Sequence, residues 1–151
     1  MKTLSVRQPW AWLIIAGFKP IENRSRFTHI RGRILIHAPM KFDWTGYKWV
    51  RETYPEIEMP KMPGFNYGGI IGSAVIDSVI TQADSPWFFG KYGYVLKDPK
   101  ELTFIPCRGQ LGFFNALPAI QAAEMELRGQ DWAKAQHKEL QNLITEWGTH
   151  A

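Results

Sequence analysis

The chain has 151 residues, of which 45% are hydrophobic, 21% charged and 14% aromatic, and its formal net charge is +4. This length and composition are typical of one globular domain and exclude intrinsic disorder, collagen-like repeats and a membrane span. The longest apolar run, 10–17, is far shorter than the roughly 18 residues that cross a bilayer, and no apolar signal segment opens the chain. We therefore expect a cytoplasmic protein.

Positive charge is concentrated in the first third of the chain. Residues 1–54 hold ten Lys/Arg and three Asp/Glu, whereas residues 55–117 hold five and six, and residues 118–151 hold three and five. Five cations lie close together in the first segment, with Glu22 as the only acidic residue among them: Lys19, Arg24, Arg26, Arg31 and Arg33. Such a cluster attracts phosphates, although a solvated face of a basic protein would explain it equally well.

Short β-rich segments and one apolar segment make up the start of the chain. We expect strands at 2–6, as an edge strand, at 21–27 and at 33–37. A short buried helix is expected over 10–16, because Gln8-Pro9 places proline where a missing amide proton costs least. Gly17 is positioned to end this helix in a left-handed conformation.

The middle of the chain predicts a second helix and then a run of strands. Asp43 can cap a helix that runs to about Thr53, and three prolines then impose a loop over 55–64 that can form a rim or lid. Further strands are expected at 68–80, 93–97, 100–106 and 109–114, the second and third joined at Asp98-Pro99. Five or more short strands imply a small barrel.

Helix-forming residues dominate from Pro118 onwards, and Asp131 can cap a second helix there. Five apolar residues share one helical face: Trp132, Leu140, Leu143, Ile144 and Trp147. These 34 residues cannot bury that face alone, so we expect a domain over 1–117 and a helical extension over 118–151 packed on it. The alternative is that the face meets a partner protein or a second copy of the chain.

The densest group of chemically useful residues follows the first helix, in the segment Gly17-Phe-Lys-Pro-Ile-Glu-Asn-Arg24. Residues 22 and 24 of a strand project to the same side, and a turn can bring Lys19 near them. Two cations and a carboxylate would then form a clamp for a phosphate or carbonyl, with Glu22 able to act as a base. A surface ladder of ion pairs is the structural alternative.

These residues also carry a resemblance to a known family. Leu4-Ser-Val-Arg-Gln-Pro-Trp-Ala, followed by Gly17-x-Lys-x-x-Glu-x-Arg24, resembles the ASCH family, whose barrel is like that of PUA RNA-binding domains. Later segments resemble the family's pattern too: 32–38, 69–79 and 87–96. The resemblance covers residues 1–116 and implies an α+β fold, a PUA-like small β-barrel flanked by helices, with the C-terminal tail outside it.

The resemblance implies a cleft between barrel and helix in which Lys19, Glu22 and Arg24 face a nucleic acid or nucleotide. Family members include RNA or DNA binders, nucleases, and a branch that deacetylates modified cytidine with a lysine and a threonine nucleophile. This chain has Glu22 where that branch has threonine, and a carboxylate is a poor substitute for an activated hydroxyl in acyl transfer. Water activated by Glu22, with Lys19 and Arg24 stabilising an oxyanion, is the alternative chemistry.

Our main hypothesis is binding of RNA, with DNA or a nucleotide as other ligands. The expected contact residues are Arg7, Gln8, Trp10, Lys19, Arg24, Arg26, His37, Trp87 and Lys91. The cations would hold phosphates, and Trp10 or Trp87 would stack on a base, worth roughly 1–3 kcal/mol, unless these rings only fill the core. His37 could donate to a phosphate, although a structural histidine is the commoner case.

The alternative is a hydrolase acting on RNA, as a ribonuclease, or on a modified nucleoside, as an amidohydrolase. Its catalytic residues would be Lys19, Glu22 and Arg24. No spacing of His, Cys and carboxylates specifies a metal, and no motif specifies a cofactor. The single cysteine, Cys107, cannot form an internal disulfide and is expected to be a small buried hydrophobe.

Overall fold

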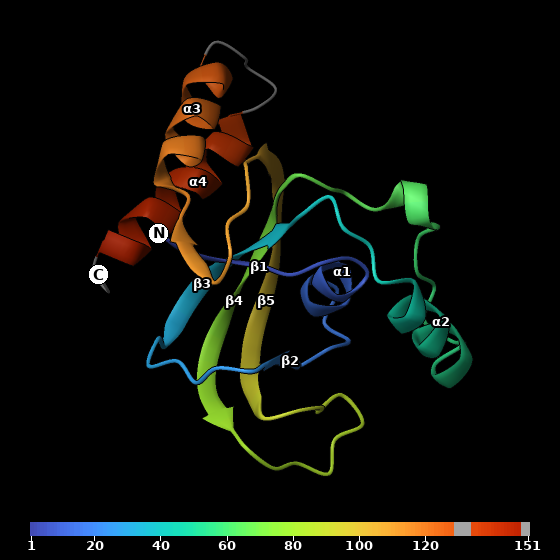
Figure 1. Cartoon of the computed structure of the whole chain (residues 1–151). Coiled ribbons are helices and arrows are strands. Elements are labelled where there is room, and N and C mark those ends of the chain that lie inside the picture. The colour runs from blue at the N-terminus through green and yellow to red at the C-terminus, as the bar shows by residue number, and fades with distance from the viewer. Residues whose placement is uncertain (129–133, 149–151) are drawn as a thin grey trace.

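A computed structural model describes residues 1–128 and 134–148 of the protein, and its core is one curled sheet (Figure 1). The strands are β1 (Lys2–Ser5), β2 (Ile21–Arg24), β3 (Gly32–Ala38), β4 (Gly69–Ile80), β5 (Tyr92–Pro106) and β6 (Phe113–Asn115). The helices are α1 (Trp10–Ile15), α2 (Trp44–Thr53), a short 3-10 turn η1 (Met62–Gly64), α3 (Leu117–Leu127) and α4 (Lys134–Gly148). No helix among the described residues is long and apolar enough to cross a membrane.

The sheet has six strands in the order β2-β5-β4-β3-β1-β6. Within this described sheet β1 and β3 pair in parallel, and the other neighbouring strands are antiparallel. The long strands β4 and β5 bend along their length, so the sheet forms a half-barrel that wraps partly around α1 (Figure 1). The expected α+β class is therefore confirmed, while the expected small barrel is a half-barrel with β2 and β6 at the two edges of the described sheet.

The two N-terminal helices begin and end as their residues predict. Gly17 has a φ of +90° directly after α1, and its amide donates to the Ile14 carbonyl at 3.1 Å, which ends the helix. Asp43 caps α2 by accepting from the amide of Gly46 at 2.9 Å. Since α2 ends at Thr53, its predicted bounds are confirmed.

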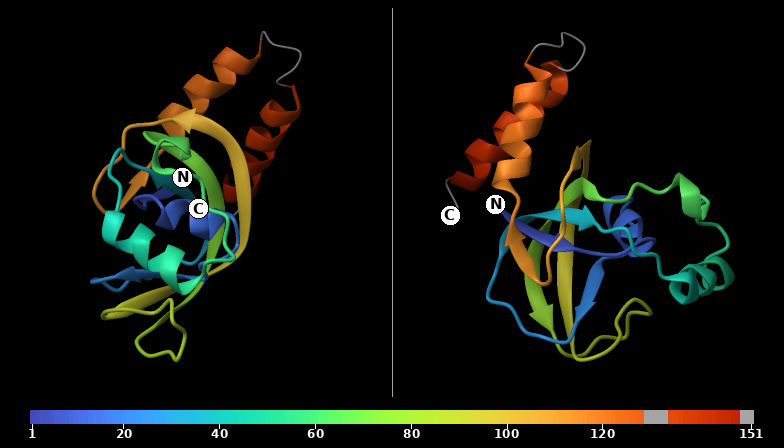
Figure 2. Two further views of the ribbon diagram at one scale, coloured as in Figure 1. Left: turned by 90° about the vertical axis from the view of Figure 1, so that its right-hand side faces the viewer. Right: turned by 45° about the horizontal axis from the view of Figure 1, so that its top comes forward.

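Alternation along β3 divides the core between the two faces of the sheet. Ile34 and Ile36 join an inner cluster with Ala11 and Ile14 of α1, whereas Leu35 points to the opposite face. There α3 and α4 supply much of the packing, and Figure 2 shows this helix pair on the side of the sheet away from α1 and α2. A third cluster joins α1 to α2 through Leu13 and Val50.

The described part of the C-terminal tail buries its apolar face against the sheet. Leu140, Leu143 and Trp147 of α4 are buried in one cluster with Phe114 and Ile120. Ile144 packs partly buried against the same cluster. Trp132 and Asp131, also expected on this helix, lie outside the described residues.

Two predictions about strands are wrong. The segment 2–6 is not an edge strand, because β1 lies between β3 and β6. The segments 93–97 and 100–106 are one strand, β5, since Asp98 takes a φ of +48° and the register against β4 shifts, so the ladder accommodates Asp98-Pro99 as an irregularity. Local turn signals cannot distinguish such a bulge from a hairpin.

Candidate functional site

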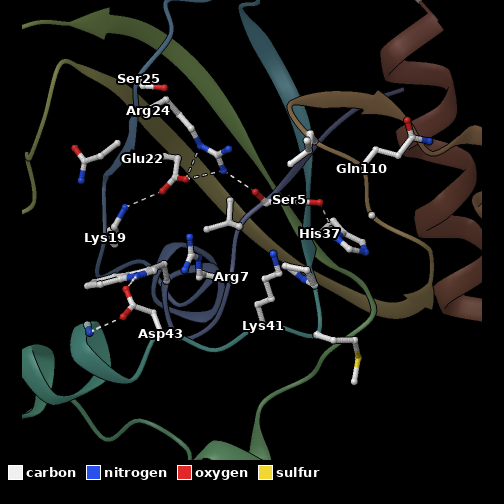
Figure 3. A pocket seen from close by; sticks show the side chains of 18 of the residues that line it. Ser5, Arg7, Lys19, Glu22, Arg24, Ser25, His37, Lys41, Asp43 and Gln110 are labelled. Atoms are coloured by element: carbon white, nitrogen blue, oxygen red, sulfur yellow. Dashed lines mark hydrogen bonds and ion pairs between the residues drawn. The ribbon is translucent and has the colours of Figure 1, made fainter.

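A cleft of about 1320 Å³ opens between the ends of β1, β2 and β3 and the start of α2. Segments far apart in the sequence line it, including the loop before Gly90 and the segment 107–111. Ser5, Lys19, Glu22, Arg24 and His37 all contribute to the wall, as Figure 3 shows. The cleft therefore contains the sequence motif that was expected to carry the function.

Lys19, Glu22 and Arg24 converge on one another in this wall. Lys19 Nζ lies 3.0 Å from Glu22 Oε1 and also donates to the carbonyl of Ile21. Arg24 Nε donates to Glu22 Oε2 at 2.9 Å, and Arg24 Nη2 lies 2.8 Å from the same oxygen. Nη2 also donates to the carbonyl of Ser5, so the guanidinium ties the edge strand β2 to the end of β1. Lys19 and Glu22 are buried, while the Arg24 side chain is 28% exposed.

The Glu22 carboxylate is fully committed to its two cationic neighbours. Burial by itself would raise the pKa of Glu22, but the charges and hydrogen bonds of Lys19 and Arg24 outweigh it and hold the pKa below the ordinary 4.5. An anion that is stabilised in this way, with both oxygens occupied, is a weak base. The triad retains one positive charge in excess.

Aromatic rings form one end of the cleft. Trp10, Trp49, Trp87 and Phe89 all line it, and Trp49 contacts the other three rings at centroid distances of 6.4, 5.7 and 5.6 Å. Trp10 Nε1 donates to Asp43 Oδ2 at 2.9 Å, which fixes the ring. Phe89 is 55% exposed, so this end presents an accessible ring face.

Asn23 of β2 holds the loop that carries two of these rings. Its Nδ2 donates to the Trp87 carbonyl and its Oδ1 accepts from the Phe89 amide, both at 2.9 Å. Trp87 itself is buried and stacks on Tyr54 with centroids 4.9 Å apart and planes 10° apart. Trp87 is therefore a supporting wall, and Phe89 is the exposed ring of the pair.

Three exposed cations line the cleft in addition to the triad: Arg7, Lys41 and Arg108. In residues 1–128 and 134–148, none of these three side chains makes a hydrogen bond or an ion pair. Their full charge therefore faces the cleft and solvent. By contrast, the buried Lys19 ammonium has protein partners and lies 5.6 Å from the centre of the Trp10 ring.

His37 lies in the wall as a buried, neutral side chain. Its Nε2 is 2.7 Å from the Cys107 carbonyl, which can only accept, so Nε2 carries the proton and Nδ1 accepts from Ser5 Oγ at 2.9 Å. Burial lowers the pKa of His37 below 6.5, and the hydrogen bond to Cys107 offsets part of this effect. His37 is therefore neutral at pH 7 and has no proton to offer a phosphate at Nδ1.

The structure does not bring Gln8, Arg26 or Lys91 to the cleft. Gln8 is buried and uses both ends of its amide internally, donating to the Asn66 carbonyl at 3.0 Å and accepting from the Trp12 amide at 2.9 Å. Arg26 and Lys91 are exposed but lie outside the lining, with Lys91 Nζ 5.4 Å from the centre of the Tyr92 ring. Gln8 is therefore a structural residue, because its internal hydrogen bonds use both ends of the amide.

The predicted basic cluster is not a single patch. Arg33 is buried against β4 and pairs with Asp98 and Glu146, and Arg31 donates to the carbonyls of Thr28 and Ile30. Of that cluster only Lys19 and Arg24 line the cleft, where Arg7, Lys41 and Arg108 add exposed positive charge. Among the described residues, no group of three or more His, Cys, Asp or Glu side chains could hold a metal ion.

A sequence model of the ASCH domain matches residues 4–142 of the chain. The chain belongs to the ASCH family. The match extends beyond residue 116, where the motif-based resemblance ended, into α4.

Comparison with individual proteins gives one curated relative and several solved structures. Human Activating signal cointegrator 1 is 53% identical over 38 residues, which are 25% of this ASCH chain and only 6% of that protein. The crystal structure of ASCH from Zymomonas mobilis shares 15% identity, covering 85% of this chain and 79% of that one, with a TM-score of 0.41. A crystal structure of a point mutant of the same Zymomonas mobilis protein shares 16% identity over 85% and 80% of the two chains, with a TM-score of 0.43.

Several lining residues of this ASCH protein were not singled out from its sequence: Ser5, Lys41, Trp49, Phe89 and Leu111. Trp49 and Lys41 belong to the α2 region, whose packing against α1 is a tertiary feature. Phe89 adjoins the predicted Trp87 and is the more exposed of the two. Ser5 precedes the expected Arg7 by two residues, and only its strand register opposite His37 reveals its environment.

Proposed function

We propose that this ASCH protein binds RNA in the cleft, with a PUA-like arrangement of barrel and helix, and that single-stranded RNA is the preferred ligand. The observation that supports this proposal is the combination, within the described residues, of three unpaired, exposed cations with an accessible aromatic end in one cleft. Single-strand binding proteins combine a positively charged groove with rings on which bases stack. DNA and free nucleotides would use the same features.

Phosphates would be held by Arg7, Lys41 and Arg108. Their side chains are exposed and have no protein partner among the described residues, so a phosphate gains their full charge without breaking an internal pair. Lys19 is buried against Glu22 and Ile21, which leaves it a supporting role. Arg24 can add one contact, because its Nη1 is the guanidinium nitrogen with no partner in the described part of the chain.

A base would stack at the aromatic end. Phe89 presents 55% of its surface, and Trp49 supports it edge to face at 5.6 Å. Asn23 anchors this loop through two backbone hydrogen bonds, so the backbone that carries the ring is held before a ligand arrives. Stacking on such a ring is worth roughly 1–3 kcal/mol per base.

Hydrolysis through Glu22 is the less supported alternative. General base catalysis needs a carboxylate whose pKa approaches the working pH, whereas that of Glu22 is lowered and both its oxygens accept hydrogen bonds. Lys19 and Arg24 neutralise Glu22 before they can serve an oxyanion. The motif therefore supports a binding site better than a hydrolytic one that depends on Glu22.

The decisive experiment measures the affinity for a labelled single-stranded RNA across several salt concentrations. Each phosphate contact in a single strand contributes about 0.7 to the slope of log affinity against log salt. Replacing Arg7, Lys41 and Arg108 together with alanine should lower this slope by about 2. The matched control replaces Lys2, Lys61 and Lys138, which are exposed and do not line the cleft.

Equal loss of slope in both triple variants would reject a phosphate site in the cleft. Phe89→Ala should weaken binding by roughly 5- to 150-fold with an unchanged salt slope, while Phe104→Ala, a ring outside the cleft, should have no effect. Parallel titrations with DNA of the same sequence and with mononucleotides identify the preferred ligand. Arg24→Ala should reduce the slope as well, and an unchanged slope would remove Arg24 from the site.

A further inference from the structure

A serine hydroxyl hydrogen-bonded to a neutral histidine lies in the wall of the cleft, outside the motif discussed above. Ser5 ends β1 and His37 lies opposite it on β3, with Ser5 Oγ 2.9 Å from His37 Nδ1. The Cys107 carbonyl accepts from His37 Nε2 at 2.7 Å, so Nδ1 is free to accept a proton. A hydroxyl, a base and a group that orients the base are therefore aligned.

The Ser5 hydroxyl, the His37 base and the Cys107 carbonyl that orients it correspond to the groups that activate a serine nucleophile. Such sites place the hydroxyl within about 2.6–3.2 Å of a base that a third group orients. Here the third group is a backbone carbonyl, which fixes the tautomer and the ring plane. His37 is neutral at pH 7, since burial lowers the pKa of the imidazole.

The motif residues supply a cation beside the same serine. Arg24 donates to the Ser5 carbonyl through Nη2, and its Nη1 has no partner within the described residues. A continuous line of interactions runs from Lys19 through Glu22 and Arg24 to Ser5 and His37 (Figure 3). Glu22 and Lys19 therefore hold the Arg24 guanidinium beside the main chain of Ser5.

The backbone at Gly109 packs against the Ser5–His37 pair. A Cβ at position 109 would lie 2.6 Å from His37 Cε1 and 2.9 Å from Ser5 Oγ. Both distances are too short for a Cβ contact, so a side chain here would clash with the pair. Glycine thus permits the backbone to pass close to the pair. Ser5, His37 and Gly109 all border the cleft.

We propose that Ser5 is a catalytic nucleophile for carboxylic esters and that His37 is its general base. Ser5 Oγ attacks the ester carbonyl and forms a new C–O bond, while its proton passes to His37 Nδ1. The tetrahedral intermediate collapses with cleavage of the ester C–O bond, and His37 returns the proton to the leaving alkoxide. Water then attacks the acyl-serine, giving its proton to Nδ1; the carboxylic acid departs and Ser5 regains its proton.

The proposal does not depend on RNA binding. The aromatic end of the cleft favours an ester with a planar ring, and p-nitrophenyl acetate meets this requirement without a base or a phosphate. Esterase activity without RNA binding, or RNA binding without esterase activity, would therefore separate the two proposals. A purely structural cross-strand hydrogen bond is the competing explanation for the Ser5–His37 pair.

The test treats the intact protein with a fluorophosphonate and maps the adduct by peptide mass spectrometry. One adduct on Ser5 is expected, with a burst of p-nitrophenol in the ester assay. Labelling at another residue, or no labelling at all, would overturn the proposal. This result needs only the unmodified protein. Ser5→Ala should abolish labelling and burst, and His37→Gln should slow acylation by roughly 100-fold or more. Ser25→Ala, which removes another hydroxyl from the same cleft, should behave as the unmodified protein, and an equal loss in Ser25→Ala would also overturn the proposal.

Discussion

At the level of single residues, the buried charges of Glu22 and Lys19 contribute more to the stability of the site than to the binding of a ligand. Glu22 and Lys19 are 7% and 5% exposed, and the charge of each side chain is balanced by the other. Removing one member of such a pair leaves an uncompensated buried charge, which costs about 3–5 kcal/mol. The same logic supports the proposal that the exposed cations elsewhere in the cleft hold the phosphates.

Glu22→Gln should therefore destabilise the protein by about 3–5 kcal/mol, because the Lys19 ammonium stays buried without its counter-charge. Urea unfolding monitored by tryptophan fluorescence measures this change. Asp77→Asn is the matched control, since Asp77 pairs with Lys97 at 3.2 Å but both side chains are exposed. The control should lose less than about 1 kcal/mol. Equal losses in the two variants would mean that the triad is not a buried, mutually dependent unit.

His37 predicts a pH dependence of stability near neutrality. Its pKa in the folded protein is lowered from 6.5, so the unfolded chain binds more protons at mildly acidic pH. The stabilising contribution is thus complete above pH 6.5 and is lost as the pH falls through the folded-state pKa. His37→Gln should flatten the unfolding free energy between pH 7 and about 5, whereas His29→Gln, at an exposed position, should retain the decline. Glu22, whose pKa is lowered from 4.5, titrates below this window.

At the level of elements, one aspartate couples α2 to the cleft. Asp43 Oδ1 caps the helix at the Gly46 amide, and Oδ2 accepts from Trp10 Nε1, both at 2.9 Å. Gly46 fits beneath the Trp10 ring, and a Cβ there would collide with it. The aromatic end of the cleft is consequently set by the start of α2.

Asp43→Ala should cost about 2 kcal/mol, because it removes a helix cap and a hydrogen bond to a partly buried ring. It should also lower RNA affinity by loosening Trp10. Asp43→Asn, which retains a capping oxygen, should lose less than half as much stability. Asp84→Ala, at an exposed loop position, is the neutral control. If Asp43→Ala matches Asp84→Ala in denaturant unfolding, α2 does not depend on this cap.

How far the sequence predicts the molecule differs between its elements. The bounds of α2 follow from its cap and apolar spacing, and the end of α1 follows from Gly17, because these signals are local. The convergence of Lys19, Glu22 and Arg24 was predicted because three residues on one turn and strand lie near each other in any fold. The segment 107–111 and the Ser5–His37 pair were not, since they depend on strand pairing between distant parts of the chain.

At the level of the whole molecule, the two faces of the sheet pack against different helices. The inner face and α1 support the cleft, while α3 and α4 cover the outer face, where Leu35 and Phe114 lie (Figure 2). We propose that residues 118–151 form part of the same domain as 1–117 and are not a surface for self-association. The described tail supports this view, because Leu140, Leu143 and Trp147 are already buried within the chain.

Leu140→Ala should then destabilise the whole domain in one cooperative transition, by about 2–5 kcal/mol, because it opens a cavity between α4 and the outer face. Leu111→Ala removes the same atoms from a fully exposed side chain and should change stability by less than about 0.5 kcal/mol. Truncation after Leu117 should produce a chain that aggregates or unfolds. A truncated chain that stays folded and monomeric, with a full-length protein that dimerises with rising concentration, would instead make the tail an association surface.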